Sequence, residues 1–131
     1  TFITGHDATG NAPTAVDWKT LAQSSPVIVA YMSMKTLPVI VDALIAGGRK
    51  AGEPVAVVTN ATLPDQHVLE SDLSHVVDDV IAADLAPPAI VCFGRVVLMR
   101  KTLDWIGHLS GEAPRDLDPL GVRNGKARNA S

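Results

Sequence analysis

The chain has 131 residues, of which 47% are hydrophobic and 19% are charged. This composition is typical of a folded domain with a hydrophobic core, not of a disordered segment. The formal net charge is −3 and the lysine and arginine residues form no cluster, so we expect no nucleic-acid partner. No apolar run approaches the roughly 18 residues needed to cross a bilayer, and no signal peptide is evident. We therefore expect a cytoplasmic protein without a membrane partner.

The first residues are typical of a chain that continues from an earlier domain. The sequence begins with Thr1, and residues 1–4 look like the end of a strand whose beginning is missing. Residues 5–15 are rich in Gly, Asn, Pro and Thr, which favour loops. We therefore expect residues 1–15 to hold the end of an N-terminal domain strand and an interdomain linker, and the chain to be a piece of a longer polypeptide.

Strands and helices alternate in the segment that follows. Asp17 is expected to cap a short helix. Residues 27–32 are apolar along nearly their whole length, which predicts a strand buried on both faces. Apolar side chains recur at helical spacing over 37–45, and Gly47 with its neighbour Gly48 is expected to end that helix.

The second half of the chain repeats this alternation. Strands are expected at 54–59 and 66–70, joined by a loop. A helix is expected from about Ser74 until Pro87-Pro88 stop it, with Asp78 and Asp79 facing outward. Its predicted inner face consists of Leu73, Val76, Val77, Val80 and Ile81.

The last predicted elements are a strand over 89–93, a turn at Gly94 and an amphipathic segment through Leu103, Trp105 and Ile106. Beyond Leu109 the composition turns polar, so residues 110–131 are expected to form a disordered tail.

The order of these elements predicts an α/β layer fold over residues 16–109. The connection between the strands at 54–59 and 66–70 is too short for a helical crossover. At least one strand pair must then be antiparallel, so we expect a mixed sheet, with parallel and antiparallel pairs, flanked by helices.

Polar and sulfur-containing side chains follow three of the predicted strands. Open α/β sheets bind ligands beyond the carboxyl ends of their strands. The carboxyl ends of predicted strands, with the residues that follow them, are expected at Tyr31-Met32-Ser33, at residues 59–62 and at Phe93-Gly94-Arg95. By residue type alone, Met32 and Met34 more often fill a core, and Asn60 and Thr62 are ordinary turn residues.

Other chemistry finds little support in the residue patterns. The four histidines show no spacing of a zinc site, and the single cysteine, Cys92, lies in an apolar run, so we expect no metal and no cysteine nucleophile. The G-x-S-x-G, GxGxxG and P-loop patterns are absent. The residues by themselves predict an α/β ligand-binding domain and no more.

Six motifs, taken in order, resemble a known family. They are T-G-H at 4–6, D-W-x-x-L-A at 17–22, V-x-Y-M at 29–32, P-V-A-V-V-x-x-A-T at 54–62, D-Q-x-V at 65–68, and P-A-I-V-x-x-G-R-V-V followed by L-x-W at 88–105. Together they resemble the C-terminal half of the uroporphyrinogen-III C-methyltransferases, which are tetrapyrrole methylases. The similarity extends over about residues 1–108.

This resemblance implies two α/β domains with S-adenosylmethionine held in the cleft between them. The family transfers two methyl groups to C2 and C7 of uroporphyrinogen III, giving precorrin-2 for sirohaem and cobalamin synthesis and S-adenosylhomocysteine as the second product. The resemblance also implies that the protein is a homodimer and that its catalytic groups lie in the N-terminal domain. The catalytic residues are therefore not expected in this chain, and the fragment alone is expected to be inactive.

Within this chain, the resemblance implies cofactor contacts at Met32 and Ala61. Their neighbours Tyr31, Asn60 and Thr62 are expected to line the same pocket. A small residue at Ala61 would permit close backbone approach to the cofactor.

Two further positions gain a role from the resemblance. His6 is a candidate for binding a carboxylate of the substrate, which carries eight of them, and a hydrogen bond within its own loop is the alternative. Ser33 stands where the family has glycine, so its side chain is expected to crowd the cofactor or displace it slightly.

Two other functions stay open at this point. One is a stand-alone, non-catalytic domain that binds a nucleotide-like ligand or mediates dimerisation. The other is a different tetrapyrrole methylase that acts on precorrins. The combination of P-V-A-V-V-x-x-A-T with G-R-V-V and L-x-W favours the uroporphyrinogen enzymes.

Overall fold

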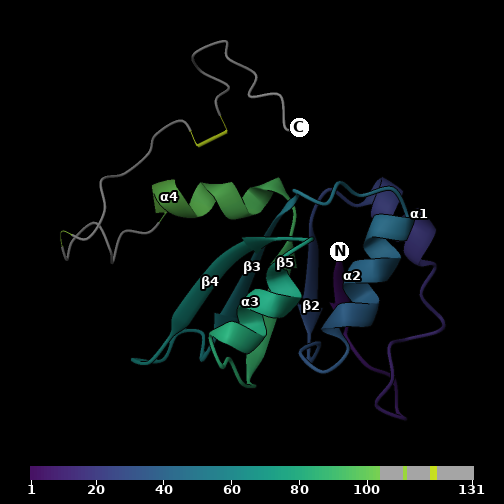
Figure 1. Ribbon diagram of the computed structural model, residues 1–131, viewed down its shortest axis with the longest axis horizontal. Coiled ribbons are helices and arrows are strands. Elements are labelled where there is room, and N and C mark those ends of the chain that lie inside the picture. The colour runs from purple at the N-terminus through teal and green to yellow at the C-terminus, as the bar shows by residue number, and fades with distance from the viewer. Residues whose placement is uncertain (104–110, 112–118, 121–131) are drawn as a thin grey trace.

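The computed structural model describes residues 1–103, 111, 119 and 120 (Figure 1). Within them, five strands form one sheet in the order β1-β2-β5-β3-β4. The strands are β1 (Phe2–Thr4), β2 (Ile28–Tyr31), β3 (Pro54–Thr59), β4 (His67–Asp72) and β5 (Ala89–Phe93). The helices are α1 (Trp18–Ser24), α2 (Leu37–Ala46), α3 (Val76–Ala82), the 3₁₀ helix η1 (Arg95–Met99) and α4 (Arg100–Leu103).

Strand direction decides which loops meet. β1 and β2 are parallel, whereas β5 runs antiparallel to both of its neighbours, β2 and β3. β4 is antiparallel to β3. The predicted mixed α/β sheet is therefore confirmed. β2 and β3 end at one edge of the sheet, and β5 begins there.

This topology corrects one predicted strand exit. Phe93-Gly94-Arg95 lies at the opposite edge from Tyr31, because β5 runs against β2. The residues of β5 that reach the edge of Tyr31 are those at its start, since Ala89 pairs with Thr59 and Ile90 with Tyr31.

The core lies between one face of the sheet and helices α2 and α3, with the small helix α1 packed beside α2 (Figure 1). Ile28 and Phe93 face each other across β2 and β5, and both are fully buried. Burial of an aliphatic or aromatic side chain of this size contributes about 1.5–3 kcal/mol. The largest fully buried apolar side chains are Phe93, Ile28, Leu37, Ile40, Leu44, Leu73, Val55, Val57, Val76 and Val91.

The helix signals that the sequence predicted at α1 and α2 are confirmed. The Asp17 side chain accepts hydrogen bonds from the backbone N–H and the hydroxyl of Thr20, at 3.0 and 2.7 Å. Pro38 lies in the first turn of α2, where its missing N–H costs no helical hydrogen bond. Gly47 follows the last helical residue, and Gly48 turns the chain with a φ of 104°.

Helix α3 differs from its prediction in three respects. Ile81, predicted to face inward, is 73% exposed, because it is turned by about 100° from its buried neighbour Val80. Asp79 is half-buried and accepts a hydrogen bond from the Ser71 hydroxyl. The helix ends at Ala82 and not at the prolines, since the chain already turns at Asp84 with a φ of 51°.

Several predictions at the ends of the chain stay open. β1 pairs with β2 within the same sheet, and the domain boundary at residue 15 is still a prediction. Leu103 is exposed, whereas Trp105 and Ile106 lie outside the described residues. Nearly all of the tail predicted at 110–131 lies outside them as well. Within the described part of the chain, none of the helices combines the length and the apolar character of a membrane span.

A side chain at Gly94, directly after β5, would clash with the backbone that leads into β2. Gly94 has a φ of 122°, and a Cβ there would lie 2.4 Å from the carbonyl oxygen of Pro26. Gly48 has a similar φ of 104°, but a Cβ there would meet nothing within 4 Å. We expect Gly48→Ala to lower the free energy of unfolding by about 1–2 kcal/mol through backbone strain. Gly94→Ala should cost about 1–3 kcal/mol more through overpacking.

Urea unfolding of both variants measures this difference. Equal losses would contradict the close approach between Gly94 and Pro26.

His75 and Asp72, at the C-terminal end of β4, shift each other's pKa in opposite directions. His75 Nδ1 lies 2.8 Å from Asp72 Oδ1, and this hydrogen bond raises the pKa of His75 above its ordinary 6.5. Hydrogen bonds, first from the Ser74 hydroxyl and then from His75, lower the pKa of Asp72 below 3.8. The stabilisation from His75 is complete below pH 6.5 and is lost as the pH rises through its raised pKa. That from Asp72 is present above pH 3.8 and is lost as the pH falls through its lowered pKa.

We expect Asp72→Asn to lower the pKa of His75 toward its ordinary value in an NMR titration. Assignment of the His75 signal comes from a His75→Gln variant. An unchanged pKa would show that Asp72 does not hold the imidazolium.

Candidate functional site

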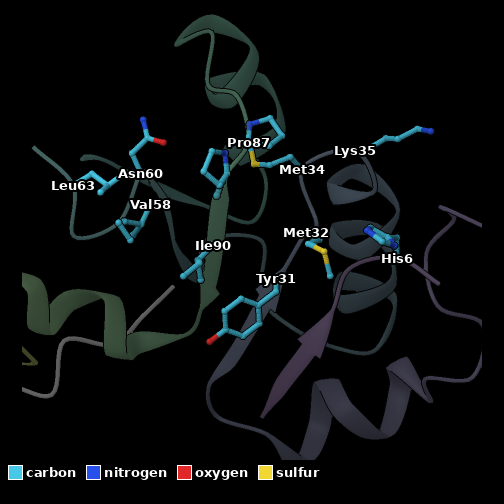
Figure 2. Close-up of a pocket in the computed structure, with 13 residues that line it drawn as sticks. His6, Tyr31, Met32, Met34, Lys35, Val58, Asn60, Leu63, Pro87 and Ile90 are labelled. Carbon is cyan, nitrogen blue, oxygen red and sulfur yellow. The ribbon is translucent and has the colours of Figure 1, made fainter. Parts of the chain in front are cut away.

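A cavity of about 830 Å³ opens at the edge of the sheet where β2 and β3 end and β5 begins (Figure 2). Its volume lies in the range of small-molecule sites, about 300–1,000 Å³. Four segments far apart in the sequence contribute to it: the loop after β1, the β2–α2 connection, the β3–β4 loop and the start of β5. Its lining residues are His6, Tyr31, Met32, Met34, Lys35, Val58, Asn60, Ala61, Leu63, Pro87, Pro88, Ala89 and Ile90.

Most of the residues predicted to bind ligand are brought together here. Tyr31, Met32, Asn60 and Ala61 line the cavity, and so does His6. Thr62, the remaining member of the predicted set, does not line it. The roles of all these residues remain predictions.

The strand register explains part of the lining. Tyr31 pairs with Ile90 across β2 and β5, and Ile90 pairs with Val58 across β5 and β3. Directly paired residues point to the same face of a sheet, so these three side chains form a continuous row. The Tyr31 ring also stacks on Phe2, with ring centroids 6.1 Å apart. The cavity thus has a rigid floor made of strands.

The two methionines behave differently. Met32 is 58% exposed, so the reading of this residue as core filling is wrong. Met34 is half-buried and packs against the core while it also lines the cavity. Figure 2 shows Met32 beside His6 on one side of the cavity, opposite Asn60 and Leu63.

The backbone at this edge is strained. Among the described residues, four that are not glycine have a positive φ, and three of them follow β2 or β3. They are Met32 at 52°, Asn60 at 48° and Thr62 at 71°. Such conformations are costly for a long side chain and still more for a β-branched one, and they concentrate at functional sites. The sequence gives no signal of this strain, because Met and Thr are not residues that favour positive φ.

Ser33 does not project into the cavity. Its side chain is fully buried, and it is not among the lining residues. A Cβ on Gly5 would lie 2.3 Å from the Cα of Ser33, so the two backbones are in close contact. The Thr36 hydroxyl donates a hydrogen bond to the carbonyl oxygen of Gly5 beside this contact. The Ser33 side chain faces Gly5 and not the cavity, so it does not crowd the cavity directly, and its effect on a bound cofactor stays a prediction.

The charged groups of the cavity are basic. His6 and Lys35 line it, and no Asp or Glu does. Nδ1 of His6 lies 3.0 Å from the carbonyl oxygen of Asp7, so the alternative of a hydrogen bond within its own loop is also present. Cys92 does not line the cavity, and burial raises the pKa of its thiol. In the described part of the chain no three His, Cys, Asp or Glu side chains are grouped as they would be around a metal ion.

Several lining residues were not predicted as site residues. Pro87 and Pro88 were interpreted only as a helix stop, and Lys35 and Leu63 were not singled out. The antiparallel direction of β5 brings the prolines to this edge. The signal that could have found them is the short β3–β4 connection, which already implied a reversal of strand direction.

The strain at Met32 can be tested through stability. Met32→Gly should raise the free energy of unfolding by about 0.5–1 kcal/mol, since glycine relieves the positive φ and the exposed side chain contributes little burial. Met32→Val should lower it by about 1–2 kcal/mol, because a β-branched residue fits this conformation poorly. Thermal and urea unfolding measure both.

Met34→Gly is the matched control. Met34 has no positive φ and packs on the core, so its replacement should destabilise the protein. Destabilisation by Met32→Gly as well would contradict the strain.

Comparisons with known proteins agree with this geometry. The family model described as Tetrapyrrole (Corrin/Porphyrin) Methylases matches residues 1–77. The chain is 54% identical over 111 residues to a uroporphyrinogen-III C-methyltransferase of Sinorhizobium sp., covering 85% of this chain and 40% of that protein. It is 35% identical over 105 residues to a siroheme synthase of Hahella chejuensis, covering 80% of this chain and 22% of that protein. This chain therefore spans less than half the length of these relatives.

Solved structures show the same architecture. The uroporphyrin-III C-methyl transferase of Thermus thermophilus complexed with S-adenyl homocysteine superposes with a TM-score of 0.62 at 26% identity, covering 73% of this chain and 41% of that one. A cobalt precorrin-4 methyltransferase, at 22% identity and a TM-score of 0.63, shares the fold; the match covers 72% of this chain and 40% of that one. By fold, by family model and by identity to a curated relative, the chain belongs to the tetrapyrrole methylases.

Proposed function

We propose that this chain is the C-terminal domain of an S-adenosylmethionine-dependent methyltransferase that methylates uroporphyrinogen III at C2 and C7 to give precorrin-2. The product would serve sirohaem and cobalamin synthesis. One observation carries the proposal: the cavity brings together Met32 and Ala61, the two positions that match cofactor contacts of the family, from loops that are 29 positions apart. The 54% identity to the Sinorhizobium enzyme supports the same reaction.

The lining fits S-adenosylmethionine. The cofactor combines an apolar methyl thioether with an adenine and a ribose, and when bound it supplies an electrophilic methyl group. Met32, Tyr31 and Ile90 offer apolar and aromatic surface. The small Ala61 lets the backbone of the β3–β4 loop approach a ligand closely. The Thermus protein of similar fold is complexed with S-adenyl homocysteine, which supports this assignment.

The basic rim fits a polyanionic substrate. Uroporphyrinogen III carries eight carboxylates, and His6 and Lys35 line the cavity without any acidic side chain. This local charge is opposite to the net charge of −3 of the chain. Basic side chains at the cavity favour the approach of an anionic substrate to this edge of the sheet. His6 and Lys35 would orient the substrate, and positioning of the two reactants is the main source of rate in such a displacement.

Several side chains that line the cavity are exposed, and we infer that another part of the protein covers them. Tyr31, Met32 and Leu63 are 40%, 58% and 54% exposed, although a ligand site normally buries such side chains. We propose that the N-terminal domain covers them and supplies the catalytic residues, with residues 1–15 as strand end and linker, 16–109 as the C-terminal domain and 110–131 as a tail. A cytoplasmic homodimer is part of the same proposal.

The test uses the chain alone and a chimera in which it replaces the matching segment of the Sinorhizobium enzyme. We expect the chain alone to bind S-adenosylhomocysteine weakly or not at all and to be inactive. The chimera should add two methyl groups to uroporphyrinogen III, measured by mass spectrometry. Met32→Ala in the chimera should weaken S-adenosylhomocysteine binding by about tenfold, the equivalent of about 1.4 kcal/mol of lost contacts.

Four outcomes would contradict the proposal. Turnover by the chain alone would place the catalytic groups in this domain. A folded but inactive chimera, beside an active Sinorhizobium parent, would remove the assigned reaction. Tight ligand binding by the chain alone would favour a stand-alone binding domain. Activity of the chimera only on a precorrin would favour a different tetrapyrrole methylase.

A further inference from the structure

We propose that Gln66 and Asp65 are positioning residues, which hold the turn of Asn60, Ala61 and Thr62 in the strained conformation that makes Ala61 a wall of the cavity. The link from this turn to cofactor affinity depends on the proposed function. The link from Gln66 and Asp65 to the shape of the turn does not.

Two side chains at the end of the β3–β4 loop form hydrogen bonds with the turn at its start. Gln66 Oε1 accepts a hydrogen bond from the backbone N–H of Thr62 at 2.7 Å. Asp65 Oδ2 accepts a hydrogen bond from Asn60 Nδ2 at 2.8 Å. These two bonds, which we call the loop clamps, connect the start of the β3–β4 loop to the residues directly before β4.

Backbone hydrogen bonds fix the ends of the same loop. The Asn60 N–H donates to the carbonyl oxygen of Pro88, 3.1 Å away and directly before β5. The N–H of Leu63 donates to Asn60, and the N–H of Gln66 donates to Leu63, each at 3.0 Å. The N–H of Thr62 is thus bonded to a side chain, whereas the N–H groups of Asn60, Leu63 and Gln66 have backbone acceptors.

The loop needs such clamps because its conformation is unfavourable. Asn60 and Thr62 have φ values of 48° and 71° on either side of Ala61. A β-branched threonine gains nothing intrinsically from a positive φ, so other interactions must maintain it. Without them the turn would relax toward negative φ, and Ala61 would leave its position in the cavity.

This geometry changes the expected roles of two residues. Thr62 was predicted to touch the cofactor, but it lies outside the lining, and its contribution is the N–H that Gln66 holds. Asn60 lines the cavity while Asp65 engages its amide nitrogen. Figure 2 shows Asn60 and Leu63 together on the wall that faces Met32. The Gln66 clamp would therefore act on a cofactor through Ala61, and the Asp65 clamp through Asn60 and its neighbour Ala61.

The first experiment measures the turn in this chain by amide hydrogen exchange and φ-sensitive NMR couplings at Thr62. Gln66→Leu removes the acceptor at nearly constant size and should speed exchange of the Thr62 amide by about tenfold. Gln66→Glu keeps an acceptor oxygen at the same reach and should preserve protection. Asp65→Ala is a second variant that loosens the same turn if Gln66→Leu does not fold.

The second experiment measures the dissociation constant of S-adenosylhomocysteine in the chimera described above. Gln66→Leu should weaken binding by about tenfold and Gln66→Glu should restore it, at a temperature where all variants are fully folded. Asp72→Ala is the matched control, because it removes a side-chain acceptor from the backbone N–H of Ser74 at the other end of β4. This control should leave the affinity unchanged.

The outcomes separate the two proposals. Unchanged exchange at Thr62 in Gln66→Leu would overturn the clamp. Faster exchange of the Thr62 amide with unchanged affinity for S-adenosylhomocysteine would overturn the role of Gln66 in shaping the cofactor site. If the chimera without substitutions binds no S-adenosylhomocysteine, the proposed function fails, and the exchange data still decide whether Gln66 holds the turn.

Discussion

The antiparallel placement of β5 between β2 and β3 is the constraint on which the site depends. β2 and β3 both run toward the cavity, and β5, which pairs antiparallel with both, runs away from it. One consequence is that the two loops that leave β2 and β3 flank the residues that enter β5. The cavity therefore has two irregular walls, at residues 32–35 and 60–63, around a floor of regular strand residues. In an all-parallel sheet, Phe93 and Gly94 would lie here in place of Pro88 and Ala89.

Close backbone contacts hold the first of these walls. Gly5 and Ser33 approach so closely that no side chain fits on Gly5, and the backbone N–H of Gly5 donates to the carbonyl oxygen of Tyr31 at 2.6 Å. The Thr36 hydroxyl adds a buried hydrogen bond to the Gly5 carbonyl, directly before α2 begins. The loop after β1, the end of β2 and the start of α2 are thereby tied together. Met32 lies between these fixed points, which is how the fold maintains its positive φ.

The second wall is held differently. No buried contact comparable to that of Gly5 and Ser33 is evident among the described residues of the β3–β4 loop, most of which are exposed. Hydrogen bonds within the loop and one to Pro88 maintain it instead. The two walls thus combine a rigid side, anchored in the core, with a side whose shape rests on polar side chains that compete with water. Although the β3–β4 loop lies at the surface, substitution of its polar residues should change the affinity for a ligand.

The sequence by itself determined the α/β class, the mixed sheet, the positions of its strands, the cap at Asp17 and the family. These features follow from local periodicity, short connections and motif order, which are properties of neighbouring residues. It also placed Tyr31, Met32, Asn60, Ala61 and His6 at one site, although only through resemblance. The tertiary structure alone decided that Phe93 lies at the opposite edge of the sheet from the cavity, that Ile81 is exposed, that Ser33 faces Gly5 and that the Thr62 N–H donates to Gln66. Each of these depends on strand direction, side-chain rotation or backbone strain, which are set by contacts between segments far apart in the chain and leave no local pattern.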